Sequence, residues 1–176
     1  MSDTPAQLWF VDDETEIREA VAQLFQLEGF ICQTSANPFE MLKQLTPDYA
    51  GIILTDIHMP AINGLQLLEK VKAIDPELPV VVLTGYGAVA LAVKALQAGA
   101  YDFLEKPFDN THLLEVVQRA LEKRRLTLEN RALKAAVTRE QQPGQRILGQ
   151  SPPMQQLRQL IDQIIDAPAD VLLYGE

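Results

Sequence analysis

Cysteine is almost absent from the sequence, since Cys32 is the only one among 176 residues. A single cysteine excludes an intrachain disulfide and is in keeping with a reducing compartment. Basic residues are scarce in residues 1–109, which hold 6 of the 15 Lys and Arg but 16 of the 24 Asp and Glu. This acidity argues against nucleic-acid binding by that part of the chain, because phosphate contacts need Lys and Arg.

The sequence also has no long apolar segment. Its longest uncharged stretch, residues 78–93, is interrupted by Pro79, Gly85 and Gly87, whereas a membrane span needs about 20 apolar residues. No basic segment followed by an apolar one opens the chain, so we expect no signal peptide. The sequence therefore predicts a cytoplasmic protein that makes no contact with a membrane.

Five short apolar runs alternate with segments of helical spacing. The runs are nearly continuous, so we expect strands that are covered on both faces, as in a parallel sheet. Strands that alternate with helices give right-handed crossovers and an open, doubly wound α/β domain. The five predicted strands are Leu8–Val11, Phe30–Cys32, Ile52–Leu54, Val80–Leu83 and Tyr101–Leu104.

A fifth helix is predicted to start near Asn110, and the next helix breaker is Pro143. This helix is longer than a domain of this size can cover, so the leucines of its second half need another partner. Residues 126, 130, 133 and 137 follow the spacing of a coiled-coil seam, which predicts a homodimer through residues 110–140. The alternative is a solvated linker helix with scattered leucines. The residues assigned to the dimerisation linker are Leu121, Leu126, Asn130, Leu133 and Val137.

Residues 147–176 have the pattern of the start of another domain. Ser151-Pro152 begins a predicted helix, and Asp170–Tyr174 has the composition of a strand. One helix and one strand cannot bury their apolar faces alone. We therefore expect a fragment of a second domain whose remainder is missing.

Polar residues that can carry chemistry follow four of the five predicted strands. Asp12 and Asp13 follow the first strand, Asp56 the third, Thr84 the fourth and Lys106 the fifth. Ligands of open parallel sheets bind beyond the carboxyl ends of the strands, so these side chains should converge. Each residue alone is also typical of an ordinary cap or turn, and only their joint placement indicates a site.

The predicted site suits phosphoryl transfer. Three neighbouring carboxylates repel one another unless a cation joins them, and an oxygen-rich site suits Mg²⁺. Asp56 is then placed to attack phosphorus as a carboxylate nucleophile. Lys106 would offset the charge of the phosphoryl oxygens, and Thr84 would donate a hydrogen bond to them.

These residues resemble the signature of two-component response-regulator receiver domains, over residues 7–125. The resemblance implies a flavodoxin-like receiver fold for residues 1–125 and a phosphorylation switch, not an enzyme. It also implies that a phosphohistidine on a sensor histidine kinase is the phosphoryl donor. The matching motifs are Val11-Asp12-Asp13, Thr55-Asp56 with Met59-Pro60 and Gly64, Leu83-Thr84, and Lys106-Pro107-Phe108.

The resemblance carries a role to each residue of the site. It implies that Asp56 is the phosphoacceptor and that Thr84 and Lys106 bind the phosphoryl group. It implies a cis peptide bond between Lys106 and Pro107. The Mg²⁺ ligands it implies are Asp13 and Asp56 directly, Asp12 through water, and the backbone carbonyl of His58.

Two further positions concern switching and the lifetime of the phosphorylated state. Thr84 and Phe103 occupy the family's switch positions, and Phe103 stands where tyrosine is common. Phenylalanine cannot donate a hydrogen bond, so any switching must act through packing. The family uses the positions of His58 and Tyr86 to set the dephosphorylation rate, although the carbonyl of His58 alone is an equal alternative.

The carboxyl-terminal part carries a second resemblance. Ile147-Leu148-Gly149 and Asp170–Glu176 look like the opening of the AAA+ ATPase domain of sigma-54-dependent activators. The phosphate-binding loop is incomplete after Gly175, so we expect no ATPase activity from this chain. The whole sequence is similar to the NtrC class, and within it to C4-dicarboxylate transport regulators. The resemblance implies that sigma-54 RNA polymerase and DNA are partners of a full-length parent protein and not of this chain alone.

Two alternatives to the phosphorylation switch stand beside it. A magnesium phosphatase with an aspartyl nucleophile would place that nucleophile and a second Asp two residues later after the first strand, whereas here Asp12 and Asp13 are adjacent. A structural dimerisation module with a vestigial acidic cluster would form no covalent adduct. The complete set of acids, Thr84 and Lys106 disfavours this module.

Overall fold

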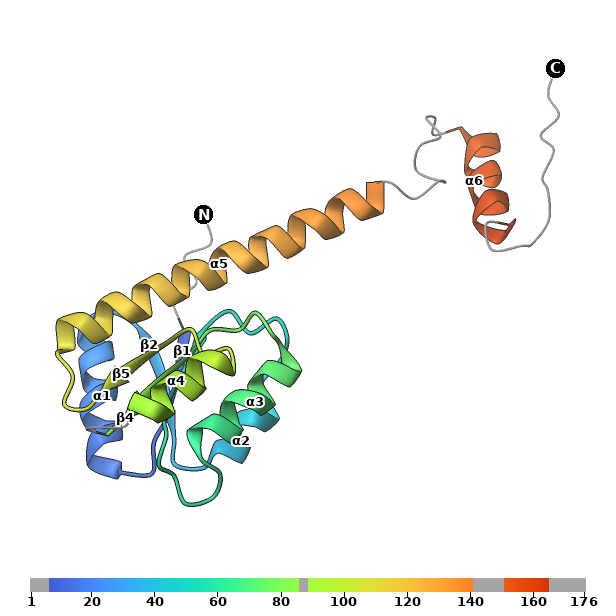
Figure 1. Cartoon of the computed structure of the whole chain (residues 1–176). Helices are drawn as coiled ribbons and strands as arrows, with labels where there is room; N and C mark the ends of the chain where they lie inside the picture. Colours follow the sequence, from blue (N-terminus) through green and yellow to red (C-terminus); the bar gives the residue numbers. More distant parts are fainter. Residues whose placement is uncertain (1–6, 86–88, 141–150, 165–176) are drawn as a thin grey trace. The chain divides into compact units, whose positions relative to one another are not determined.

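The computed structural model describes residues 7–85, 89–140 and 151–164, and the chain divides into two units, Met1–Glu129 and Asn130–Glu176. Strands and helices alternate through the first unit, as the sequence predicts (Figure 1). Helix α5 contains residues of both units. The elements are β1 (Gln7–Val11), α1 (Thr15–Leu27), β2 (Ile31–Ser35), α2 (Pro38–Gln44), β3 (Ile52–Asp56), α3 (Gly64–Ile74), β4 (Val80–Thr84), α4 (Val89–Gln97), β5 (Asp102–Glu105), α5 (Asn110–Glu140) and α6 (Pro152–Ile164).

The five strands form one parallel sheet in the order β2-β1-β3-β4-β5, which confirms the predicted doubly wound α/β fold. The expectation that strands are covered on both faces holds for β3 and β4, which are buried at every residue. It is wrong for β2, where only Ser35 is buried, and for β5, where only Leu104 is buried. Both strands lie at an edge of the sheet and therefore have a neighbouring strand on one side only.

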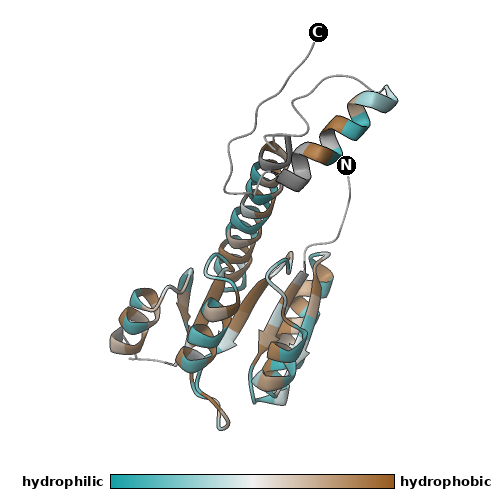
Figure 2. Cartoon of the chain, turned by 90° about the vertical axis from the view of Figure 1, so that its right-hand side faces the viewer, coloured by the Kyte–Doolittle hydropathy of each residue, from teal (hydrophilic) through white to brown (hydrophobic). Residues whose placement is uncertain are grey.

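Two layers of helices cover the sheet (Figure 1). Because side chains alternate along a strand, Leu8 and Phe10 join the core under α1 and α5, while Trp9 and Val11 join the core under α2, α3 and α4. Figure 2 shows the strands as mainly hydrophobic and the helices as mixed in hydropathy. This arrangement leaves the carboxyl-terminal ends of the strands open for a site.

The start of α3 packs closely against the end of β3. Asn63 and Gln66 form a capping box, in which each side chain accepts a hydrogen bond from the backbone amide of the other residue. The Gly64 amide donates to the carbonyl of Ile57 at 2.9 Å. A Cβ at Gly64 would overlap the carbonyl oxygen of Asp56 and lie 2.9 Å from the Cα of Ile57. Glycine is therefore required here for close approach and not for an unusual φ.

The long helix predicted from Asn110 is present, since α5 runs unbroken for 31 residues. The helix predicted from Pro152 is also present as α6, whereas the predicted linker at residues 141–144, the motif at 147–149 and the strand at 170–174 lie outside the described residues. None of the helices in the described ranges is long and apolar enough for a membrane span.

Candidate functional site

Lys106 lies between two carboxylates at the carboxyl-terminal edge of the sheet. Its Nζ is 2.6 Å from Oδ1 of Asp56 and 2.9 Å from Oδ2 of Asp12. The register of β1 and β3 explains why these carboxylates lie close together. Val11 pairs with Thr55, which places the next residues, Asp12 and Asp56, side by side. Three residues that the sequence predicts for the site are thus brought together from β1, β3 and β5.

Asp12 is fully buried and every one of its oxygen atoms has a partner. Oδ2 accepts from Lys106, and Oδ1 accepts a hydrogen bond from the Glu14 amide at 2.8 Å. Its backbone carbonyl accepts from Nη1 of Arg18 at 2.7 Å, and Nη2 of Arg18 donates to Oγ1 of Thr15 at 2.9 Å. The loop between β1 and α1 is therefore held by side chains at both of its ends.

Asp56 is nearly buried, with 6% of its surface exposed. Its Oδ2 accepts from the amide of His58 at 2.5 Å, while Oδ1 pairs with Lys106. Its carbonyl accepts a hydrogen bond from the Thr55 hydroxyl at 3.0 Å. These contacts fix the orientation of the Asp56 carboxylate at the edge of the sheet. If Lys106 moved to another partner, Oδ1 of Asp56 would lose its ion pair and could contact a ligand.

The remaining predicted residues line the same edge. Thr84 is buried at the end of β4, and its hydroxyl donates to the Gly85 carbonyl at 3.4 Å. Asp13 and His58 are exposed in the loops after β1 and β3. Phe103 is half-buried on β5. Tyr86 lies outside the described residues.

Lys106 is held in the charged form by its two neighbours. Burial alone would lower the pKa of its ammonium, but hydrogen bonds to Asp56 and Asp12 outweigh burial and raise that pKa above its usual value. The ammonium offsets only part of the charge of the two paired carboxylates and the adjacent Asp13. The peptide bond that follows, Lys106-Pro107, is cis, as the resemblance implied.

The donor set at this edge fits a hard cation. Carboxylates of Asp12, Asp13 and Asp56 and the carbonyl of His58 offer oxygen only, which is the chemistry that Mg²⁺ prefers. Within the described ranges, no three His, Cys, Asp or Glu side chains are clustered closely enough to hold a metal. In this arrangement the Lys106 ammonium stands between the carboxylates of Asp12 and Asp56.

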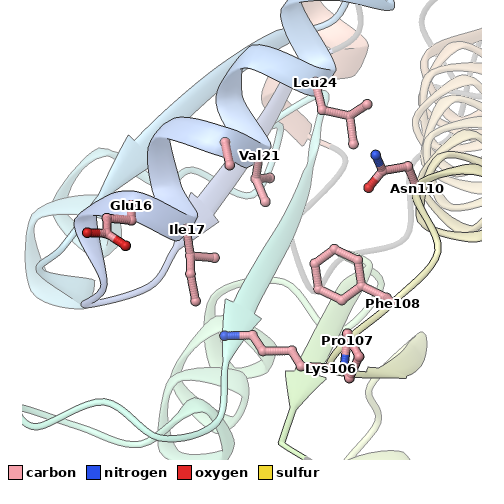
Figure 3. Close-up of a pocket in the computed structure, with 9 residues that line it drawn as sticks. Glu16, Ile17, Val21, Leu24, Lys106, Pro107, Phe108 and Asn110 are labelled. Carbon is pink, nitrogen blue, oxygen red and sulfur yellow. The ribbon is translucent and has the colours of Figure 1, made fainter.

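A pocket of about 620 Å³ opens beside Lys106. Figure 3 shows Ile17, Val21 and Leu24 of α1 pointing toward Phe108, with Lys106 nearby. A second pocket of about 660 Å³ follows β5 and the start of α5, and Phe103 and His112 line it. The site is thus flanked by an apolar hollow and by a more polar one.

The proposed linker residues fall into two groups. Leu121 packs against the core under α1 and α5. Leu126, Leu133 and Val137 are 50%, 61% and 52% exposed, and Asn130 is exposed as well. The apolar positions from Leu126 onward therefore remain available for a partner.

Arg18 is a site residue that the sequence did not reveal. It contacts a backbone carbonyl and a hydroxyl, and neither contact leaves a signal in the spacing of charged or apolar residues. Its place four residues after Glu14 in the first helix looks like that of any solvated helix residue.

The fold and the site define an open, doubly wound α/β domain with an Asp–Lys–Asp centre at the carboxyl-terminal edge of its sheet. Residues 8–118 match the family described as response regulator receiver domain. The chain belongs to this family.

Known proteins resemble the chain beyond the receiver. It is 43% identical to the C4-dicarboxylate transport transcriptional regulatory protein DctD of Rhizobium meliloti, over 100% of this chain and 38% of that protein. DctD of Pseudomonas aeruginosa is 41% identical over 99% of this chain and 38% of its own length. The crystal structure of NtrX from Brucella abortus matches with a TM-score of 0.65 and 34% identity, covering 92% of this chain and 35% of that one.

The chain spans little more than a third of the length of these relatives. Their names describe whole regulators, so what these relatives regulate is a property of longer proteins.

Proposed function

We propose that the chain is the phosphorylation switch of a two-component regulator and that Asp56 accepts the phosphoryl group from a phosphohistidine of a sensor kinase in the cytoplasm. The observation that carries this proposal is the Lys106 bridge between Asp56 and Asp12. An Oδ oxygen of Asp56 attacks phosphorus, the histidine nitrogen leaves, and an acyl phosphate forms on Asp56.

The surrounding side chains support this transfer. The Lys106 ammonium, freed from one carboxylate oxygen of Asp56, pairs with the phosphoryl oxygens and offsets their charge. The Thr84 hydroxyl exchanges its weak 3.4 Å contact with Gly85 for a phosphoryl oxygen. Phe103 has no hydroxyl group that could form a hydrogen bond with Thr84. It therefore transmits any change through packing on β5.

Asp12, Asp13, Asp56 and the carbonyl of His58 would hold Mg²⁺ at this edge. When bound, Mg²⁺ supplies positive charge that lets an anionic donor approach the carboxylates. The protein itself orients the carboxylates, because those of Asp12 and Asp56 accept hydrogen bonds from the backbone amides of Glu14 and His58.

The output is proposed to pass through α5. Leu126, Leu133 and Val137 would pair in a coiled-coil homodimer with Asn130 at a core position. Phosphorylation would then favour one of two dimer arrangements over the other. In a full-length parent this change would control a sigma-54-dependent ATPase domain, whose opening segment residues 147–176 resemble.

Intact-protein mass spectrometry after incubation with acetyl phosphate and Mg²⁺ tests the proposal. We expect one added phosphoryl group, absent from Asp56→Asn and absent without Mg²⁺, but retained in the exposed control Asp48→Asn. An adduct that persists in Asp56→Asn, or no adduct on the folded wild type with acetyl phosphate or a kinase, would contradict it. Continuous hydrolysis of a phosphate ester would instead indicate a magnesium phosphatase.

A further inference from the structure

An arginine side chain of α1 holds the loop between β1 and α1. Arg18 sends one guanidinium nitrogen to the Asp12 carbonyl, at 2.7 Å, and the other to the Thr15 hydroxyl, at 2.9 Å. Its two contacts therefore close both ends of the loop that carries Asp13. The planar guanidinium is suited to this task because its donors are fixed relative to one another.

The start of α1 has no N-cap hydrogen bond from a side chain. Its N-cap residue, Glu14, makes no side-chain hydrogen bond to the helix, although such a bond commonly secures a helix start. The amide of Glu14 instead donates to the Asp12 carboxylate at 2.8 Å. That bond depends on the same carboxylate that pairs with Lys106 and would face a cation.

The Arg18 contacts do not depend on that carboxylate. They reach the carbonyl of Asp12 and the hydroxyl of Thr15, so a change of partner at the Asp12 carboxylate does not by itself remove them. A brace of this kind preorganises ligands, which lowers the cost of binding.

We propose that Arg18 is a positioning residue, which holds the 12–15 loop so that Asp12 and Asp13 are ready to bind Mg²⁺. This inference rests on the proposed function. Arg18 touches neither the acceptor nor the phosphoryl group, and it acts through the backbone of the loop.

A positioning role and a charge role predict opposite results. If Arg18 acted only through its charge, Arg18→Ala would make the site more negative and tighten Mg²⁺ binding, while Arg18→Lys would change nothing. A brace predicts that both variants bind Mg²⁺ more weakly, because lysine cannot reach both ends of the loop at once. Loss of an outer-shell partner of a metal site weakens affinity by roughly tenfold or more.

Isothermal titration of the full chain with MgCl₂ measures this directly. We expect roughly tenfold weaker binding for Arg18→Ala and Arg18→Lys, a smaller loss for Thr15→Val, and none for Arg119→Ala, an exposed arginine with only a 3.4 Å contact within α5. Amide hydrogen exchange at Glu14 should be faster in both Arg18 variants. Circular dichroism establishes that each variant is folded.

Unchanged or tighter Mg²⁺ binding by folded Arg18→Ala, or wild-type affinity in Arg18→Lys, would overturn the positioning role while leaving the proposed function intact. A wild-type chain that binds no Mg²⁺ and accepts no phosphoryl group would overturn both.

Discussion

Arg124 and Asp75 form an ion pair that is shut off from solvent, with Nη1 of Arg124 2.7 Å from Oδ2 of Asp75. Arg124 is 0% exposed and Asp75 is 1% exposed. The same guanidinium donates to the carbonyls of Tyr49 and Pro47, both at 2.8 Å. One side chain of α5 is thus tied to the end of α3 and to the segment that precedes β3.

Arg124→Met should destabilise the receiver strongly. It removes the ion-pair partner of the buried Asp75 carboxylate and the donors to two carbonyls, and breaking one side of a buried pair costs about 3–5 kcal/mol. Urea unfolding followed by circular dichroism measures this loss. Asp75→Leu combined with Arg124→Met should recover part of it, since neither charge then remains buried.

Arg125→Met is the matched control for this prediction. Arg125 lies next in the chain and pairs with Glu122 and Glu129 on the surface of α5, where these side chains are more than half exposed. Exposed pairs contribute little, so the urea midpoint should not move. Equal losses in the two variants would show that burial of the Arg124 pair is not what matters.

Gly64→Ala should disturb the site itself. The added methyl group overlaps the carbonyl of Asp56, so the start of α3 or the end of β3 must shift, at a cost of about 1–3 kcal/mol. Phosphorylation of Asp56 by acetyl phosphate, followed by mass, should slow in the folded variant. The control is Gly29→Ala, which has φ of 81° and open space around the new Cβ. It should lower stability but leave the phosphorylation rate unchanged.

The sheet was predictable because a strand covered on both faces is an apolar run, and β3 and β4 are such strands. The second strand was placed at Phe30–Cys32 but runs over Ile31–Ser35, because an edge strand tolerates Gln33 and Thr34 on its exposed surface. Chain topology also predicted the meeting of the polar residues at the strand ends.

The contacts of Arg18 and Arg124 were not predictable in the same way. Arg124 bonds to the backbone of Tyr49, 75 residues earlier in the chain, and a backbone carbonyl has no sequence identity to read. A long side chain can be buried or solvated at the same position on a helix. Only the packing of α5 against the loop before β3 decides between these outcomes.

The thiol of Cys32 should react slowly with alkylating reagents in the folded protein. Partial burial of the Cys32 thiol raises its pKa from 9.0 to about 12, and only the thiolate reacts with iodoacetamide. Alkylation, read as a single mass increment, should be slow at pH 8 and accelerate up to about pH 12. Between pH 9 and 12 the unfolded chain loses this proton while the folded one keeps it, so stability should fall as pH rises. Cys32→Ala should lack that part of the decline, and rapid alkylation at pH 8 without urea would contradict the prediction.

Leu133→Lys should weaken the proposed homodimer. Leu133 is 61% exposed in the single chain, and burying a leucine contributes about 1.5–3 kcal/mol, an amount that a dimer loses twice. A lysine at the seam also brings two like charges together. Sedimentation equilibrium should therefore show a shift toward monomer for Leu133→Lys but not for Ala135→Lys, which adds the same charge at an exposed position outside the 126–130–133–137 seam. If the wild type sediments as a monomer both with and without acetyl phosphate, α5 is a solvated linker and the coiled-coil interpretation is wrong.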